Sequence, residues 1–408
     1  MAVPDLSLYV HVPFCLGKCS YCDFYSITEL GSASRVVDRT LDEGARALDL
    51  LGTPRLATVY VGGGTPSALR RPDLERLLGG IARWCAGPPD ELTVEANPET
   101  VDEAFIEICG GAGATRLSVG VQTLEPALLG LLGRRATREQ TLAALDLVAR
   151  RWKGDVSVDL LAGIPGQSGE RLIEDIEAVL RFSPRHVSLY SLTREEGTPY
   201  DRMIRAGRLR EMPAEEQERV WLAGVRLLRS RGYGHYEISN FALPGGECRH
   251  NLSYWELRPY LGIGPAAVST LPGGSTGVVR LSRPRSVSGW LSGAALQVEE
   301  IEPREFLFET LMMGLRLARG VSVRAIRERF GEEALGRLEE LWAAMHGSHG
   351  ARLRAGRLAL TRRGWLLLSG FLSKLLDETR GLRVRQPPGW PDGASRGLAP
   401  LAAGGAFT

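Results

Sequence analysis

The sequence predicts an α/β protein, in which a partial β/α barrel of six units and TIM type is followed by a smaller α+β domain of winged-helix-like shape. Three observations predict this fold. Short apolar or β-branched runs alternate with segments of helical periodicity over residues 7–191. The alternation stops after residues 236–255. Residues 305–345 then have the pattern of two or three helices, and residues 350–376 have that of a hairpin followed by a helix.

Six runs are predicted to form the strands of the barrel, because their length and β-branched content are typical of strands. The segments between them, such as 71–85 and 138–151, place apolar residues three and four positions apart, which predicts helices. Strands that alternate with helices form a parallel sheet. The predicted strands are SLYVHV (7–12), ATVYVG (57–62), LTVEAN (92–97), RLSVGV (116–121), VSVDLL (156–161) and HVSLYS (186–191).

The strand ends carry the residues that stand out chemically. In a β/α barrel the functional groups lie at the carboxyl ends of the strands. Five such residues lie at or just past the end of a predicted strand, so the sequence predicts one shared pocket. They are Cys15, Gly63, Glu95, Gln122 and Asp159.

The chain divides into four predicted segments. The barrel is expected over residues 1–235, a connecting segment over 236–300 and the winged-helix-like domain over 301–380. Residues 381–408 are rich in Pro, Gly and Ala and offer little for a core, so they are expected to be disordered.

Composition and charge narrow the class of protein. A formal net charge of +2, with both signs mixed along the chain, argues against a dedicated nucleic-acid binder. No apolar run reaches the roughly 18–20 residues of a membrane span, and the N-terminus lacks the pattern of a signal peptide. We therefore predict a cytoplasmic protein with no integral membrane segment. Six cysteines in 408 residues are too few for a disulfide scaffold.

Cys15, Cys19 and Cys22 follow the first predicted strand in the pattern C-x3-C-x2-C. A compact loop could direct all three thiolates to one centre, and iron–sulfur clusters are held by cysteine thiolates. Three ligands leave one iron of a [4Fe–4S] cluster open for another molecule. The alternative is a structural zinc site with His11 or Cys248 as the fourth ligand. Two further cysteines are expected to be ordinary thiols, Cys85 and Cys109.

The cysteine spacing at the first strand of a β/α barrel resembles the radical S-adenosylmethionine (SAM) superfamily. In that superfamily the open iron chelates the amino and carboxylate groups of SAM, and an electron from the cluster cleaves SAM to a radical. Further motifs occur in the order of the oxygen-independent coproporphyrinogen III oxidase family, over residues 5–375. They are YVHVPFC, VGGGTPS, VEANPE, SVGVQT, LGR, DLLAGIPGQ, EEGTPY, YEISNFA and CRHNLSYW.

The resemblance also implies a set of SAM-binding residues. A guanidinium pairs with a carboxylate in a fork, which suits Arg134 of LGR. Glu95 is a candidate for the amine, and Gln122 and Asp159 are candidates for the ribose. GGGTP (62–66) lacks the Gly-Lys-Ser/Thr of a phosphate loop, and its glycines would allow close approach of the backbone to SAM. The family also implies Tyr9, Tyr21, Gly63, Gly64 and Thr65 in this pocket.

Phe24 separates two branches of the family. The oxidases carry another cysteine two residues after the third cluster ligand and an additional N-terminal segment, whereas this chain has Phe24 and begins six residues before the first predicted strand. Both features resemble the haem chaperone branch, which binds haem and delivers it to respiratory proteins. That branch carries a further motif, expected here to contact haem, with imidazole as a possible axial ligand. Its residues are His250, Asn251, Tyr254 and Trp255.

Two departures from the family pattern bear on haem. Members often have a histidine two residues after the arginine of LGR and another in a GAHS-like stretch, where this chain has Ala136 and Val268. Haem binding is therefore expected to be weaker or differently ligated. The runner-up function is the oxidase itself, which decarboxylates propionate side chains of coproporphyrinogen III. A third hypothesis is a DNA-reading role, because several arginines gather on the predicted hairpin. They are Arg352, Arg354, Arg357, Arg362 and Arg363.

The favoured prediction is a haem chaperone of radical SAM type. Its expected cofactors are a [4Fe–4S] cluster, SAM and haem. Its expected partners are haem-accepting apo-proteins of respiration and a reductant for the cluster, with no nucleic acid. The chain is expected to be a monomer or a cluster-linked dimer.

Overall fold

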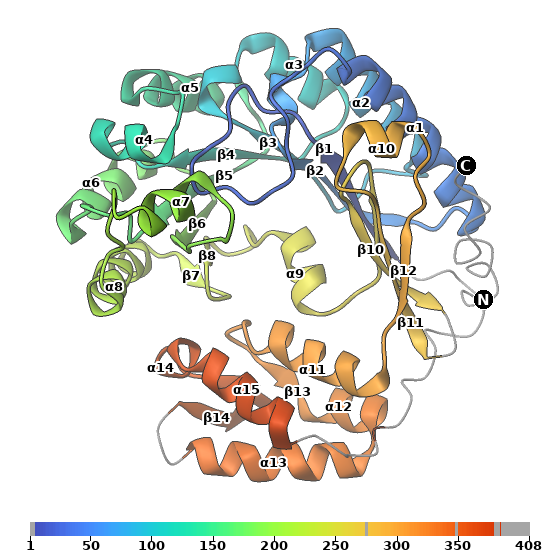
Figure 1. Cartoon of the computed structure of the whole chain (residues 1–408), viewed down its shortest axis with the longest axis vertical. Helices are drawn as coiled ribbons and strands as arrows, with labels where there is room; N and C mark the ends of the chain where they lie inside the picture. The colour runs from blue at the N-terminus through green and yellow to red at the C-terminus, as the bar shows by residue number, and fades with distance from the viewer. Residues whose placement is uncertain (1–4, 274–275, 347–349, 379–383, 385–408) are drawn as a thin grey trace.

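The computed structural model describes residues 5–273, 276–346, 350–378 and 384. One curved sheet of twelve strands dominates it, in the order β12-β11-β10-β9-β1-β2-β3-β4-β5-β6-β8-β7 (Figure 1). Of the segment 381–408, which was expected to be disordered, the structure describes only residue 384. The prediction of disorder therefore lies outside the described residues.

The six predicted strands form the central part of this sheet, and every neighbouring pair among them is parallel. The predicted fold class is therefore confirmed. On two neighbouring strands the alternate residues Leu8 and Val10, and Val59 and Val61, are fully buried. The strands are β1 (Leu6–Val12), β2 (Leu56–Gly63), β3 (Glu91–Ala96), β4 (Arg116–Gln122), β5 (Asp155–Ala162) and β6 (His186–Ser191).

Both edges of the parallel part are extended by residues 234–300, most of which were expected to connect two domains. One short strand pairs antiparallel with β6, while another, β9, pairs parallel with β1 on the opposite side. Four of the six added strands have only two to four residues, which is too short for a local pattern to predict them. The added strands are β7 (Gly234–His235), β8 (Asn240–Ala242), β9 (Tyr260–Ile263), β10 (Val268–Gly273), β11 (Gly277–Ser282) and β12 (Gln297–Glu300).

Helices cover the convex side of the sheet (Figure 1). Helix α5 begins with a capping box, in which the Thr137 hydroxyl accepts from Gln140 N–H and the Gln140 amide oxygen accepts from Thr137 N–H. The helices up to residue 230 are α1 (Ala33–Leu50), α2 (Arg71–Trp84), α3 (Glu103–Gly111), α4 (Pro126–Leu132), α5 (Arg138–Arg151), α6 (Gly169–Leu180), α7 (Pro199–Arg205) and α8 (Ala214–Ser230). Two single turns follow β2 and β3, at Pro66–Ala68 and Pro98–Thr100.

A smaller domain follows, with its own core around Phe306, Phe330 and Trp342. Its three-stranded sheet has the order β13-β15-β14. Three helices and then a hairpin and a helical end match the predicted pattern. The elements are α11 (Pro303–Gly314), β13 (Val321–Ser322), α12 (Val323–Phe330), α13 (Glu332–His346), β14 (Ala351–Arg354), β15 (Arg357–Leu360), α14 (Arg362–Leu366) and α15 (Leu368–Glu378).

The short helix α9 (Arg249–Trp255) lies on the concave side of the sheet and contacts both β2 and α11, between the sheet and the smaller domain (Figure 1). It carries the HNLSYW motif. Helix α10 (Val287–Leu291) packs instead against α1 on the outside. Among the helices that the structure describes, none has the length and apolar character needed to cross a membrane.

Candidate functional site

The loop after β1 carries Cys15, Cys19 and Cys22 and is held at three points by backbone hydrogen bonds. Cys15 N–H donates to the carbonyl oxygen of Ile27 at 3.0 Å. Ser20 N–H donates to Leu132 O at 2.9 Å, and the carbonyl of Ser20 accepts from Tyr200 N–H at 2.7 Å. The end of α4 and the start of α7 therefore fix the loop over the carboxyl ends of the strands.

The three loop thiols are half-buried and unbridged. The Thr65 hydroxyl donates to Cys15 Sγ at 3.4 Å, and Arg134 Nη1 donates to Cys19 Sγ at 3.5 Å. Cys22 lies within electrostatic range of both other thiols. Two of the three sulfurs therefore accept hydrogen bonds from neighbouring side chains, and burial raises the pKa of the Cys22 thiol to about 11. Iron binds the thiolate form.

Neither side chain proposed as a fourth zinc ligand is available. His11 Nε2–H donates to the carbonyl oxygen of Tyr25 at 2.9 Å, so its Nδ1 accepts from the Tyr9 hydroxyl at 2.9 Å. Cys248 is buried and donates to Glu91 Oε1 at 3.2 Å. In the described part of the chain no three His, Cys, Asp or Glu side chains are placed to hold one metal ion. A four-iron cluster does not require three side chains on one ion, because each thiolate binds a different iron.

The glycines after β2 are required by close packing on β1. Gly63 has a φ of +97°, and a Cβ at this position would lie 2.3 Å from His11 Nδ1 and 2.6 Å from the Tyr9 hydroxyl. A Cβ on Gly64 would lie 2.5 Å from the carbonyl oxygen of Val12. From the sequence these glycines were expected to allow close approach to SAM. In the structure they are also needed for packing, because β2 and β1 meet here without room for a side chain.

Glu95 projects from β3 and accepts two hydrogen bonds, from the Tyr60 hydroxyl at 2.6 Å and from Gly63 N–H at 3.0 Å. Burial, together with the nearby Asp159, raises the pKa of Glu95 to about 7. Asp159 lies within β5 rather than at its end, where it accepts from Ser118 Oγ at 3.2 Å. Burial also raises its pKa. Two neighbouring half-buried carboxyl groups suit a ligand that brings positive charge.

Arg134 stands at the centre of a network that joins the cysteine loop to the strand ends. Its Nη2 donates to Asn97 Oδ1 at 3.0 Å and to the carbonyl oxygen of Gly120 at 2.5 Å. Asn97 Nδ2 in turn donates to Thr65 Oγ1 at 3.0 Å. The Nε of Arg134 is buried and has no hydrogen-bond partner, so this guanidinium can still donate to a carboxylate.

Three of the remaining predicted SAM residues border the same space. Gln122 follows Gly120 in a strand irregularity and has a φ of +69°, a conformation that turns the chain at the end of β4. Tyr21 lies close to Cys19, Arg134 and Asp159. Tyr9 lies beside Tyr60, with ring centroids 6.3 Å apart. The predicted SAM residues thus gather from β1 to β5 around one position. Asn97 was missed, although the VEANPE motif contains it.

His250 is buried on α9 and uses both ring nitrogens. Its Nδ1 lies 2.8 Å from Thr58 Oγ1 and its Nε2 lies 3.2 Å from the Tyr254 hydroxyl. Its ring stacks on Tyr60 at 5.2 Å. Burial lowers the pKa of His250 to about 3, so the imidazole is neutral. These contacts favour a structural role for His250 over the axial role that we expected, because axial ligation would break the bond to Tyr254.

Glu91, which the sequence argument did not single out, fixes the start of α9. Its carboxylate accepts from the backbone N–H groups of Arg249 and His250, each at 3.0 Å. It also pairs with the buried Arg116 at 3.2 Å. A carboxylate at the first turn of a helix satisfies N–H groups and complements the helix dipole. The motif helix is therefore anchored inside the barrel by a residue about 160 positions earlier.

The other motif residues, Asn251, Tyr254 and Trp255, are half-buried. Trp255 faces the smaller domain, where the guanidinium of Arg316 lies 4.5 Å above its ring. The Trp255 indole N–H is buried without a hydrogen-bond partner. Ala136 is buried behind the cysteine loop, and Val268 is half-buried on β10.

We expect His250→Gln to destabilise the protein by about 1–3 kcal/mol at pH 8, because glutamine cannot satisfy both neighbouring hydroxyls. The deficit should shrink as the pH falls below 6.5, by up to about 1.4 kcal/mol per pH unit. The reason is that the folded pKa lies below the unfolded value of 6.5, so only the wild-type chain takes up this proton on unfolding. Anaerobic unfolding between about pH 5 and 8 measures the difference.

Thr58→Val is the matched control for this experiment. It removes one hydrogen bond of the imidazole and keeps the titrating ring, so its deficit should not depend on pH in this way. If the stability curves of the wild type and His250→Gln stay parallel, the imidazole is not held neutral in the fold.

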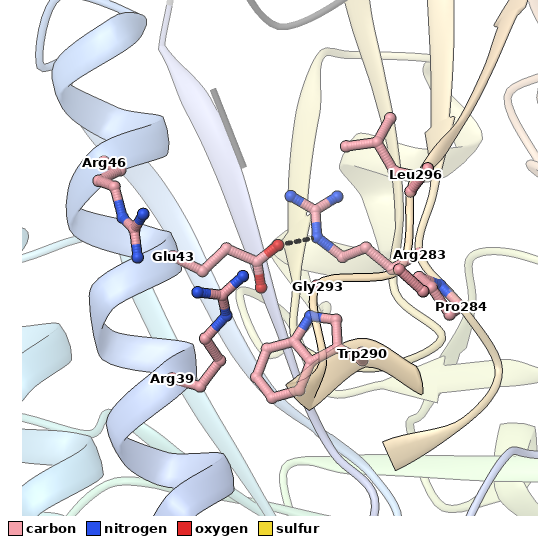
Figure 2. A pocket seen from close by; sticks show the side chains of 10 residues that line it. Arg39, Glu43, Arg46, Arg283, Pro284, Trp290, Gly293 and Leu296 are labelled. Carbon is pink, nitrogen blue, oxygen red and sulfur yellow. Dashed lines mark hydrogen bonds and ion pairs between the residues drawn. The ribbon is translucent and has the colours of Figure 1, made fainter. Parts of the chain in front are cut away.

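A pocket on the outside of the barrel, between α1 and the turn that leads to α10, contains none of the predicted site residues (Figure 2). Within it, buried Glu43 pairs with buried Arg283 and also accepts from Gly264 N–H at 2.9 Å. This ion pair ties α1 to the turn around residue 283, which in turn braces the cysteine loop: Val287 N–H donates to the Tyr25 hydroxyl at 2.8 Å.

Comparison with known proteins agrees with this geometry. The model of the radical SAM superfamily matches residues 9–179, and that of the HemN C-terminal domain matches residues 301–367. The heme chaperone HemW of Mycobacterium tuberculosis is 35% identical over 386 residues, which cover 90% of this chain and 94% of that protein. The chain belongs to the HemW family.

Two further similarities support the family assignment and the fold. The heme chaperone HemW of Synechocystis sp. is 35% identical over 77% of this chain and 78% of that protein. The solved structure of coproporphyrinogen III oxidase (HemN) from Escherichia coli, a radical SAM enzyme, superposes with a TM-score of 0.75 at 18% identity, over 91% of this chain and 90% of that one. At that identity the similarity shows the fold. Membership of the radical SAM superfamily implies a [4Fe–4S] cluster and SAM.

Proposed function

We propose that this protein is a haem chaperone of radical SAM type, which binds haem and delivers it to haem-dependent proteins of respiration in the cytoplasm. The observation that carries the proposal is the family assignment, since HemW relatives align over most of both chains. Phe24, in place of the fourth cysteine of the oxidases, supports the same branch.

We assign the cluster to Cys15, Cys19 and Cys22, and SAM to the space bordered by Glu95, Gln122, Arg134 and Asp159. When bound, the cluster offers an open iron to the amino and carboxylate groups of SAM and can pass on one electron. Arg134 orients the carboxylate through its buried Nε. Glu95 accepts the amine, because a cation beside this buried carboxyl restores its charge.

We place haem contact on the half-buried part of the HNLSYW motif, Asn251, Tyr254 and Trp255. Aromatic rings can pack against a porphyrin face. We divide the chain into a barrel of residues 1–235, a joining segment and a domain of residues 301–380. Arg316 of the smaller domain lies against Trp255 of the motif. We therefore propose that haem is bound where the two domains meet.

The basic hairpin of the smaller domain does not support a DNA-reading role. Arg352 donates to the carbonyl oxygen of Ala318 at 3.1 Å, and Arg357 donates to that of Arg319 at 2.9 Å. These two guanidiniums hold the hairpin to the preceding segment, and the net charge of the chain is close to neutral.

We expect anaerobically reconstituted protein to bind about one haem per chain and to release it to an apo-haemoprotein. Coproporphyrinogen III, SAM and a reductant should yield no protoporphyrinogen. Absorbance of the haem and chromatography of the porphyrins measure the two results. Tyr254→Ala and Trp255→Ala should weaken haem binding, whereas Leu353→Ala, an exposed residue of the hairpin, should not. Steady formation of protoporphyrinogen would instead identify the oxidase.

A further inference from the structure

Phe24 has the largest exposed fraction of the large hydrophobic residues that the structure describes, 68%. It lies two residues after Cys22 on the loop that we assign to the cluster. A single exposed apolar residue is common on protein surfaces and needs no function. Here the position is unusual, since an exposed aromatic ring lies two residues from a residue that we assign to the cluster.

Three cations lie along the cysteine loop, and each donates to one of its backbone carbonyls. Lys18 Nζ donates to Phe24 O at 2.6 Å. Arg285 donates to Asp23 O at 3.0 Å. Arg135 donates to Leu16 O at 3.4 Å. The cations come from the loop itself, from the segment after α4 and from the turn before α10.

The same three side chains are exposed, so their charge faces solvent. Arg285 also lies 3.8 Å from the carboxylate of Asp23, and both side chains are more than half exposed. Three cations and one carboxylate thus lie along the loop that carries the exposed aromatic ring. Interfaces are enriched in aromatic residues and arginine, and charge at the rim steers encounter and sets its rate.

We propose that Phe24, Lys18, Arg135 and Arg285 form the docking surface for an acidic electron-carrier protein that reduces the cluster. The inference rests on the proposed cluster site. In the step one electron leaves the reduced carrier and enters the oxidised cluster, with no bond made or broken. The loop is the part of the cluster site that reaches the surface, so a carrier docked on it approaches the cluster through Phe24 and Cys22.

The charge pattern favours an acidic carrier over a second copy of this chain. A twofold interface would place the surface against itself and bring like charges together, which is unfavourable. Electron-transfer encounters also bury little area, typically below about 1,200 Å², and a single aromatic residue within a charged rim fits such a contact.

The test uses the cluster-loaded full chain and reduced flavodoxin, an acidic carrier, with dithionite as a small reductant that needs no docking. We expect Phe24→Ala and the double variant Arg135→Glu with Arg285→Glu each to slow reduction by flavodoxin by about tenfold or more at low salt. Reduction by dithionite should stay unchanged. The double variant should also lose the salt dependence of the rate. Leu353→Ala and Arg354→Glu, on β14, are matched controls and should reduce like the wild type.

Each other outcome overturns the proposal in a recognisable way. Iron content is measured first, so a wild-type protein without iron overturns the cluster site and the docking surface together. A full cluster that flavodoxin reduces equally fast in all variants overturns the docking surface alone. The same holds if dithionite slows in parallel, or if Phe24→Ala only dissolves a dimer seen by sedimentation.

Discussion

Cys19→Ala is expected to remove the cluster: protein purified without oxygen should lose its brown colour and fall from about four irons per chain to almost none. Cys19 is the thiol that Arg134 contacts, at 3.5 Å, and its loop is fixed by the end of α4. With only two thiolates left, one more of the four irons would lack a protein ligand in addition to the open one. Iron analysis and visible absorption measure the loss.

Cys85→Ala is the matched control, because Cys85 is also half-buried and lies outside the loop. It should keep its iron, as should Cys109→Ala. The fold should survive Cys19→Ala and Cys85→Ala, since neither thiol is among the fully buried residues of the core. One zinc per chain with no iron, or a full complement of iron in Cys19→Ala, would contradict the assignment.

The barrel could be predicted from the sequence because each of its strands has a recognisable local pattern. Runs such as VSVDLL (156–161) are β-branched and apolar, and the helices between them are periodic, so each element follows from its own residues. Their order then fixes a parallel sheet. The short strands between residues 234 and 300 could not be predicted in this way. β7 has two residues and β8 has three, and both gain their stability from the edge of a sheet built elsewhere in the chain.

The same distinction holds for the candidate site. The cysteines and the strand-end residues fall where a barrel puts functional groups, so pattern and topology together locate them. The role of His250 depends instead on Thr58, about 190 positions away, and on Glu91, which anchors the helix. No local pattern shows that both nitrogens of an imidazole are occupied. The motif could be located from its residue types. The role of His250 depends on how it packs, which its residue type does not show.

His250 and Tyr60 also connect the two proposed sites. Tyr60 donates to Glu95 and stacks on His250, so one tyrosine of β2 touches both the SAM residues and the haem motif. A change in the charge of Glu95 on binding SAM would act directly on the hydroxyl of Tyr60. This contact gives a physical route by which the two ligands could sense each other.

Arg134→Ala is expected to weaken SAM binding by about 1.5–3 kcal/mol, which corresponds to roughly tenfold to more than hundredfold in affinity. The guanidinium keeps a buried Nε without a partner in the unliganded fold, and a carboxylate placed there gains a charge-assisted hydrogen bond. Titration calorimetry under anaerobic conditions measures the affinity, and iron content shows that the cluster remains.

Arg135→Ala is the control for this change, since it removes the adjacent arginine, which is exposed and bonds only the outer side of the loop at Leu16. Its SAM affinity should match the wild type. Arg134→Lys should recover part of the loss, because a lysine restores the charge but not the second donor. Equal SAM affinity in Arg134→Ala and wild type, with the cluster intact in both, would place the SAM carboxylate on another residue.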